Sequence, residues 1–213
     1  MKKICILGLA IFALVFLTAC TGSDDDVITD FVEGAFIVYE SVDELASVAT
    51  DIVRVEILDE WVEWRNVVLP PRDEDDEYLN PGGELIEQYE ISTIHQLRVL
   101  DVFQGNAQVG DIMEVAQLGG RIDNRELVNA NFVSFAAGDD VVLFLRTFYF
   151  DEERPAVLLG PMQSVYRVSH ERGDGAMTND SSDAILENIN PDNDLSLTFG
   201  DLERIRGGGN LAY

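Results

Sequence analysis

Residues 91–120 read ISTIHQLRVLDVFQGNAQVGDIMEVAQLGG and contain two stretches with the period-two alternation of β-strands. A short polar turn at Gly105–Gly110 separates the two stretches, and Gly119–Gly120 ends the second. The segment therefore predicts a β-hairpin, and the other strands of the chain can be arranged before and after it.

The first strand of this hairpin carries an irregularity. Leu97 and Val99 alternate as on one buried face, but Val102 and Phe103 are adjacent apolar residues. One extra residue near Leu100–Asp101 would restore the alternation, so the sequence predicts a β-bulge at that place.

Two further strong patterns flank the hairpin. Alternating apolar residues within Asp51–Arg65 predict a half-buried strand, and the continuous apolar run Val141–Phe150 predicts a strand buried on both faces. Ser41 and Glu44 have the spacing of a capping box, which predicts a short helix ending near Ala49.

Weaker patterns predict the remaining elements. Val27–Tyr39 is apolar enough for a first strand or a packed leader, and Arg121–Asn131 is typical of a polar connection. We expect short strands at Asn131–Ala137, Ala156–Leu159 and Ser164–Ser169, and helices near Ser182–Ile189 and Phe199–Arg206. These patterns predict a mainly β fold, namely a single antiparallel β-barrel or sandwich over residues 31–206 with short peripheral helices, followed by a flexible tail over 207–213.

The N-terminus has the features of a bacterial export signal. Two lysines precede the apolar run Ile4–Leu17, which is short for a membrane span. The sequence LTAC at 17–20 resembles the lipobox of bacterial lipoproteins. That resemblance implies a signal peptide over 1–19, a lipid such as palmitate on Cys20, a tether over 20–30, and an extracytoplasmic protein held at the membrane of the cell envelope. The alternative is an ordinary secretory signal with a chance cysteine.

The charge of the chain is strongly negative. The net charge is −26 with 40 acidic residues, and the only two lysines lie in the signal, so the remaining chain has 12 arginines and a net charge of −28. Such a surface disfavours nucleic acid and favours cations, a basic protein or a cation-rich envelope polymer. An acidic, lysine-free chain suits an alkaline or saline habitat or reflects base composition, and the sequence leaves both explanations open.

The order of the strand segments also carries a resemblance. The segments are, along the chain, TDIVRVEIL, LRVLDVFQG, VGDIMEV with LGG, GDDVVLFLR and GPMQSVYRV. They follow one another in an order that resembles a group of secreted bacterial β domains of unknown function. The resemblance covers roughly Glu44 to Arg206. The arrangement is also similar to the OB-like barrel of netrin and metalloproteinase-inhibitor domains, which implies OB-like closure. The chain lacks their cysteines, including the N-terminal Cys-x-Cys pattern, so no functional residue is carried over.

No catalytic motif stands out. His95 and His170 lie on different segments, neither has zinc-type spacing, and no G-x-S-x-G elbow is present. We expect His95 to be a solvated or hydrogen-bonded sheet residue and His170 to be solvated at the start of a loop. Paired carboxylates stay open as a hydrolytic device, because two acids can come from distant positions.

Residues 190–201 contain oxygen ligands at the spacing of an EF-hand loop. They are Asn190, Asp192, Asp194, Ser196, Thr198 and Asp201. Leu195 stands where the sharp turn of that loop requires glycine, and the twelfth position is Asp rather than Glu. The sequence therefore predicts a turn and a helix capped by Thr198, with calcium binding as the alternative and no other cofactor.

A long acidic connection at 66–90 follows two tryptophans. A connection of this length is usually functional or disordered. Trp61 and Trp64, if exposed, would form a binding platform beside this connection, which carries Arg72, and otherwise they cover a barrel end. We expect a non-catalytic binding or structural module of the cell envelope. The alternatives are a secreted hydrolase that uses paired carboxylates and a calcium-stabilised surface module.

Overall fold

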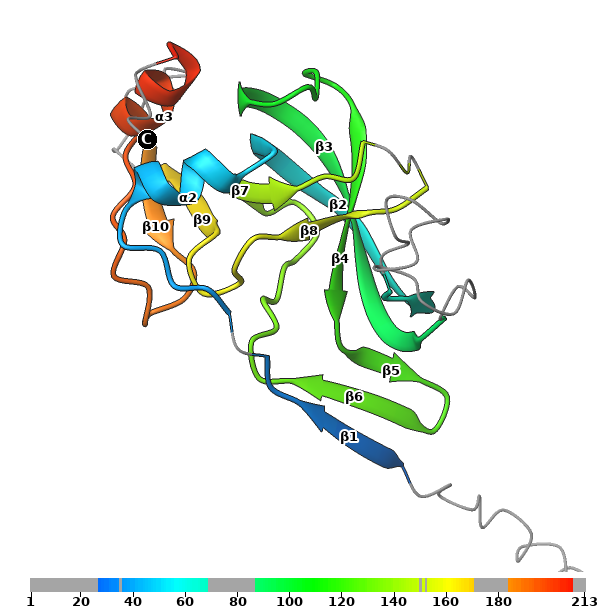
Figure 1. Cartoon of the computed structure of the whole chain (residues 1–213). Helices are drawn as coiled ribbons and strands as arrows, with labels where there is room; N and C mark the ends of the chain where they lie inside the picture. Colours follow the sequence, from blue (N-terminus) through cyan, green and yellow to red (C-terminus); the bar gives the residue numbers. More distant parts are fainter. Residues whose placement is uncertain are drawn as a thin grey trace, which may run out of the picture.

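The computed structural model describes residues 27–34, 36–68, 87–149, 151, 153–170 and 184–208 (Figure 1). The strands there are β1 (Ile28–Val32), β2 (Asp51–Asn66), β3 (Tyr89–Gln104), β4 (Ile112–Leu118), β5 (Gly120–Ile122), β6 (Arg125–Asn129), β7 (Asp140–Arg146), β8 (Ala156–Leu158), β9 (Val165–His170) and β10 (Ala184–Asn188), and the helices are α2 (Val42–Val48) and α3 (Phe199–Arg206). Strands contain 49% of the described residues and helices 10%, so the predicted mainly β fold is confirmed. Cys20, Arg72 and most of the predicted loop 66–90 lie outside the described residues.

Five strands form a nearly closed ring in the order β2, β3, β4, β8 and β7, and β7 pairs again with β2. Numbered along the chain, this order is 1-2-3-5-4, a Greek-key arrangement that agrees with the expected OB-like closure. All contacts in the ring are antiparallel except β4–β8, which is parallel. β9 and β10 continue the sheet beyond β7, and β1, β6 and β5 form a separate sheet.

The strand β7 shows why the core has two parts. The five residues Val141–Leu145 are all fully buried, as the continuous apolar run predicted, but the strand ends at the exposed Arg146 and not at Phe150. Val141, Leu143 and Leu145 face the ring interior, where they join apolar residues of β2, β3, β4 and β8. Val142 and Phe144 face the other side, where α2 and α3 cover them. Burying one such side chain contributes about 1.5–3 kcal/mol, so both faces hold β7 in place.

The predicted hairpin and its bulge are confirmed. β3 pairs with β4 and with β2. Arg54 pairs with Asp101 and Val55 with Val99, so Leu100 has no partner opposite it in β2. This extra residue is the expected bulge, because it lets the chain keep its apolar residues on the buried face on both sides of the irregularity.

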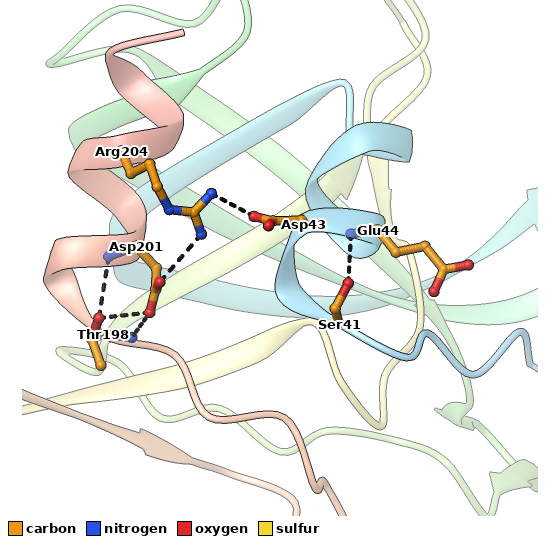
Figure 2. A network of polar contacts seen from close by, with 6 residues as sticks. All are labelled: Ser41, Asp43, Glu44, Thr198, Asp201 and Arg204. Atoms are coloured by element: carbon orange, nitrogen blue, oxygen red, sulfur yellow. Dashed lines mark hydrogen bonds and ion pairs between the residues drawn. The ribbon is translucent and has the colours of Figure 1, made fainter. Parts of the chain in front are cut away.

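Both capped helices are also confirmed. The Ser41 hydroxyl accepts a hydrogen bond from the backbone N–H of Glu44 at 3.2 Å, and Thr198 and Asp201 form a complete capping box at α3 (Figure 2). The Glu44 carboxylate departs from the expected pattern. It accepts from the backbone N–H of Glu40, not from that of Ser41.

One predicted connection and one predicted strand are wrong. Arg121–Asn131 is not a connection, because it forms the β5–β6 hairpin, whose second strand pairs in parallel with β1 from the distant N-terminal segment. Asn131–Ala137 is not a strand. The Gln117 side chain accepts from the backbone N–H of Val133 and donates to its carbonyl, at 3.0 and 2.9 Å, so the backbone bonds there go to a side chain.

The predicted helix near Ser182–Ile189 is wrong as well. Residues 184–188 form β10, which pairs antiparallel with β9. Pairing with an existing sheet edge overrides the weak helical propensity of a short segment. Of the two alternatives for Val27–Tyr39, residues 28–32 form a strand, and Tyr39 further on is buried against the helix-covered core.

Candidate functional site

A groove lies on the outer face of the ring, between the connection that leaves β2 and the connection that joins β7 to β8. Its volume is about 310 Å³. The lining side chains come from all five ring strands and the two connections, and they are Arg65, Asn66, Val67, Ser92, Ala116, Leu118, Arg146, Phe148, Arg154, Pro155 and Val157. We call this the outer groove.

The strand register places an apolar floor in the outer groove. Val115 and Ala156 are paired, and both are buried in the ring interior. Side chains alternate between the two faces of a strand, so the next pair, Ala116 and Val157, faces outward into the groove. Leu118 is on the same face of β4 as Ala116. The ring closure thus determines the floor, because only the contact between β4 and β8 brings these residues together.

Three arginines surround the floor. Arg65 pairs with Glu63 at 2.8 Å. Arg154 pairs with Asp151 at 3.3 Å, donates to the Val68 carbonyl at 2.9 Å, and lies over the Phe148 ring at 5.6 Å.

The third, Arg146, is at the end of β7 and is exposed. Within the described part of the chain its guanidinium makes neither an ion pair nor a side-chain hydrogen bond. Among the described side chains that line the outer groove, none is acidic.

A second hollow of about 370 Å³ adjoins the outer groove and shares Arg65, Asn66 and Arg154 with it. Its other lining residues are Glu63, Trp64, Asp151 and Glu153, so its character is polar and acidic. The outer groove and this hollow together form a surface that is apolar and positive on one side and acidic on the other.

The structure separates the two predicted tryptophans. Three positions apart in a strand, Trp61 and Trp64 face opposite sides of β2. Trp64 is 43% exposed, lines the acidic hollow and has the Arg125 guanidinium 5.8 Å from its ring centroid. Trp61 lines neither cavity, and its indole N–H donates to Glu63 at 2.9 Å. The two rings do not form one platform, and Arg72 lies outside the described residues.

The EF-hand-like stretch forms a turn and a capped helix. Asn190 accepts from the backbone N–H of Asp192 at 2.9 Å, and Asp194 accepts from Gln163 at 3.4 Å. The Asp201 carboxylate binds the Thr198 backbone N–H and hydroxyl and also Arg204, which reaches across to Asp43 of α2 (Figure 2).

These bonds lower the pKa of Asp201 despite its partial burial. Among the described side chains, no three His, Cys, Asp or Glu groups converge as they do around a metal ion. Ser196 is exposed beside the buried Leu195 and Leu197.

His95 is hydrogen-bonded in the sheet but is not solvated, because its ring is fully buried on the interior face of β3. Its Nε2 atom is 3.0 Å from the Gln117 side-chain nitrogen. Burial lowers the pKa of His95 to about 4. Glu60 lies 3.5 Å from the other ring nitrogen, but its carboxylate is 59% exposed, so water screens this contact. His170 ends β9, and its side chain lies outside the described residues.

A third hollow contains a different polar contact. Tyr149, which lines it, donates its hydroxyl to the buried carboxylate of Asp51, which also accepts from the backbone N–H of Asn106 at 3.1 Å. Burial and the bond to Asp51 raise the pKa of Tyr149 to about 12. At Gly105, whose φ is +108°, a Cβ atom would lie 2.0 Å from this carboxylate. Asp51 therefore holds the turn after β3 in place.

Sequence reasoning missed the outer groove, since its arginines and floor residues come from segments far apart in the chain. The one available signal was the position of Arg146 directly after the buried run of β7. No helix in the described part of the chain is long and apolar enough to cross a membrane. Comparison of the chain with models of protein families, with curated proteins and with solved structures finds no match.

Proposed function

We propose that the protein is a non-catalytic binding module whose ligand lies in the outer groove, and that the lipobox at residues 17–20 holds this module at the cell envelope. The observation that carries the proposal is a preformed groove with an apolar floor and cationic side chains on a chain with a net charge of −26.

The dimensions and lining of the groove support a small ligand. Binding sites for small molecules have volumes of roughly 300–1,000 Å³, are mainly apolar and carry a few polar groups that orient the ligand. The outer groove, at about 310 Å³, is at the lower limit of this range. It would hold a small molecule, or one unit of a larger envelope polymer.

The lining supports binding better than hydrolysis. The described residues that line the outer groove supply one hydroxyl, that of Ser92, and include neither His, Cys, Asp nor Glu. Glu63 and Asp151 of the adjoining hollow are ion-paired with Arg65 and Arg154. A catalytic pair of carboxylates would require at least one acid at the reacting position, so the groove favours a binding role.

The charge of the whole chain and the charge of the groove have opposite signs. The acidic exterior supports the expectation of a basic protein or a cation-rich polymer as an encounter partner. The outer groove supports a different local contact, since the charged side chains among its described lining residues are all arginines. The acidic exterior would therefore attract a cationic partner from a distance, whereas the arginines of the groove would contact a bound ligand.

A fragment screen by NMR tests the site. It uses the chain from residue 20 onward with Cys20→Ser, which retains every described residue, and observes the methyl signals of Ala116, Leu118 and Val157 during titration with small organic fragments. We expect the hits to shift these signals and to be lost in Ala116→Glu.

The control is Val109→Glu, which adds the same charge at a 67% exposed position in the β3–β4 turn and should retain the hits. Hits that shift only signals near Asn106 and Tyr149, or that survive Ala116→Glu, would contradict the proposal.

A further inference from the structure

Arg146 differs from the other two arginines of the outer groove. Arg65 and Arg154 are each neutralised by a carboxylate of the adjoining hollow, at 2.8 and 3.3 Å. Arg146 has no such partner within the described residues. Among the described residues, the groove therefore presents about one uncompensated positive charge.

Arg146 lies directly beside the apolar floor of the groove. Arg146 is opposite Val157 in the β7–β8 pairing, and Val157 is opposite Ala116 in the β4–β8 pairing. The three residues thus lie side by side across the ring, with the guanidinium at one end of an apolar row. A ligand that contacts the whole row would place its charged group at Arg146 and its apolar part over Val157 and Ala116.

We propose that the outer groove binds a small amphiphilic carboxylate. The carboxylate pairs with the guanidinium of Arg146, whose planar fork of donors matches its two oxygens, and the apolar body covers the floor. This proposal rests on the proposed function and specifies the chemical class of the ligand.

The charges around the groove favour an anion with a single negative charge over anions with more than one. A carboxylate carries one negative charge, which the one uncompensated arginine balances. A phosphate monoester carries about −1.5 to −2 at neutral pH and would leave negative charge in excess. Glu63 and Asp151 in the adjoining hollow are already paired with Arg65 and Arg154, but Glu153 makes no ion pair within the described residues. Its charge would repel that excess, and it would also repel a polyanionic chain that extends beyond the groove.

Four probes with the same eight-carbon chain test the proposal, namely octanoate, octanol, octyl phosphate and octyltrimethylammonium. Each is titrated into the Cys20→Ser chain described above at constant ionic strength, with the groove methyl groups and the Arg146 Nε–H as NMR signals. We expect octanoate to bind most tightly and to shift the Arg146 signal. Arg146→Gln should weaken octanoate binding by about tenfold or more and change octanol binding by less than about twofold.

Arg98→Gln is the matched control, because it removes an arginine that is outside the groove and pairs with Glu56. It should leave octanoate binding unchanged. Tighter binding of octyl phosphate, or octanoate binding that Arg146→Gln does not weaken, would overturn the carboxylate assignment even if the groove signals still shift. If none of the four probes shifts the groove signals, the carboxylate proposal is wrong, whereas fragment hits in the groove would still support the proposed function.

Discussion

Acidification should destabilise the fold through His95. The unfolded chain protonates this imidazole near pH 6.5, whereas in the folded protein its pKa is about 4. Between these values the unfolded state binds more protons, so stability falls as the pH falls. One pKa unit corresponds to about 1.36 kcal/mol. Between pH 7.5 and 4.5, His95 alone should therefore lower the free energy of unfolding by roughly 2–3 kcal/mol.

The surroundings of His95 explain why its neutral form is favoured. The Gln117 amide donates one hydrogen to the Val133 carbonyl, so its second hydrogen points to Nε2 of His95, which accepts it. Phe135 packs edge-on against the ring at a centroid distance of 4.9 Å. Protonation would place a second hydrogen between Nε2 and the Gln117 amide, in a site that water does not reach.

The assay is urea unfolding at pH 7.5 and 4.5, with His95→Gln as the comparison because glutamine is polar but does not titrate. The many acidic residues also change charge in this interval, so the quantity of interest is the difference in pH dependence between the two proteins. Between pH 7.5 and 4.5, the free energy of unfolding of the wild type should fall by roughly 2–3 kcal/mol more than that of the variant. Equal losses would refute the reasoning, as would an NMR titration of the wild type in which His95 protonates near pH 6.5.

Three further predictions concern the rest of the chain. Molar sodium chloride should raise the melting temperature, because counterions screen the self-repulsion of a chain with a net charge of −26, and a flat or falling melting temperature would contradict this. Cys20→Ala should release the protein from the membrane or leave an unprocessed precursor, and a free, unmodified N-terminus in the mass of the wild type would show that the lipobox prediction is wrong. Calorimetric titration with calcium after chelator treatment should show no tight site at residues 190–201, since Asp201 already binds Thr198 and Arg204, and micromolar binding that Asp192→Ala abolishes would refute the turn assignment.

The elements that could be predicted from the sequence have strong local patterns. The hairpin, the bulge at Leu100, the buried run of β7 and the helix capped by Thr198 each depend on neighbouring residues in one segment. The wrong predictions concern segments whose structure depends on distant partners. β10 is a strand because β9 offers an edge, and residues 131–137 follow the side chain of Gln117 rather than a neighbouring strand.

The candidate site was only partly predictable for the same reason. Trp64 lies near the end of β2, as the sequence indicated, but the hollow that it lines was not predicted. The floor depends on the parallel contact between β4 and β8, which joins residues about 40 positions apart. No local pattern marks Arg146 as the arginine of the groove that makes no ion pair within the described residues, since this appears only when the ring is closed.

The most direct test of the central claim is a measurement of contacts between a bound ligand and the floor of the outer groove. Intermolecular nuclear Overhauser effects between the chain protons of octanoate and the methyl groups of the protein report such contacts. Binding in the groove predicts effects to Leu118 and Val157, and none to the exposed methyl groups of Val109 and Ile185 elsewhere on the surface. Effects to Val109 or Ile185 with none to Leu118 and Val157 would contradict the assignment of the outer groove as the ligand site.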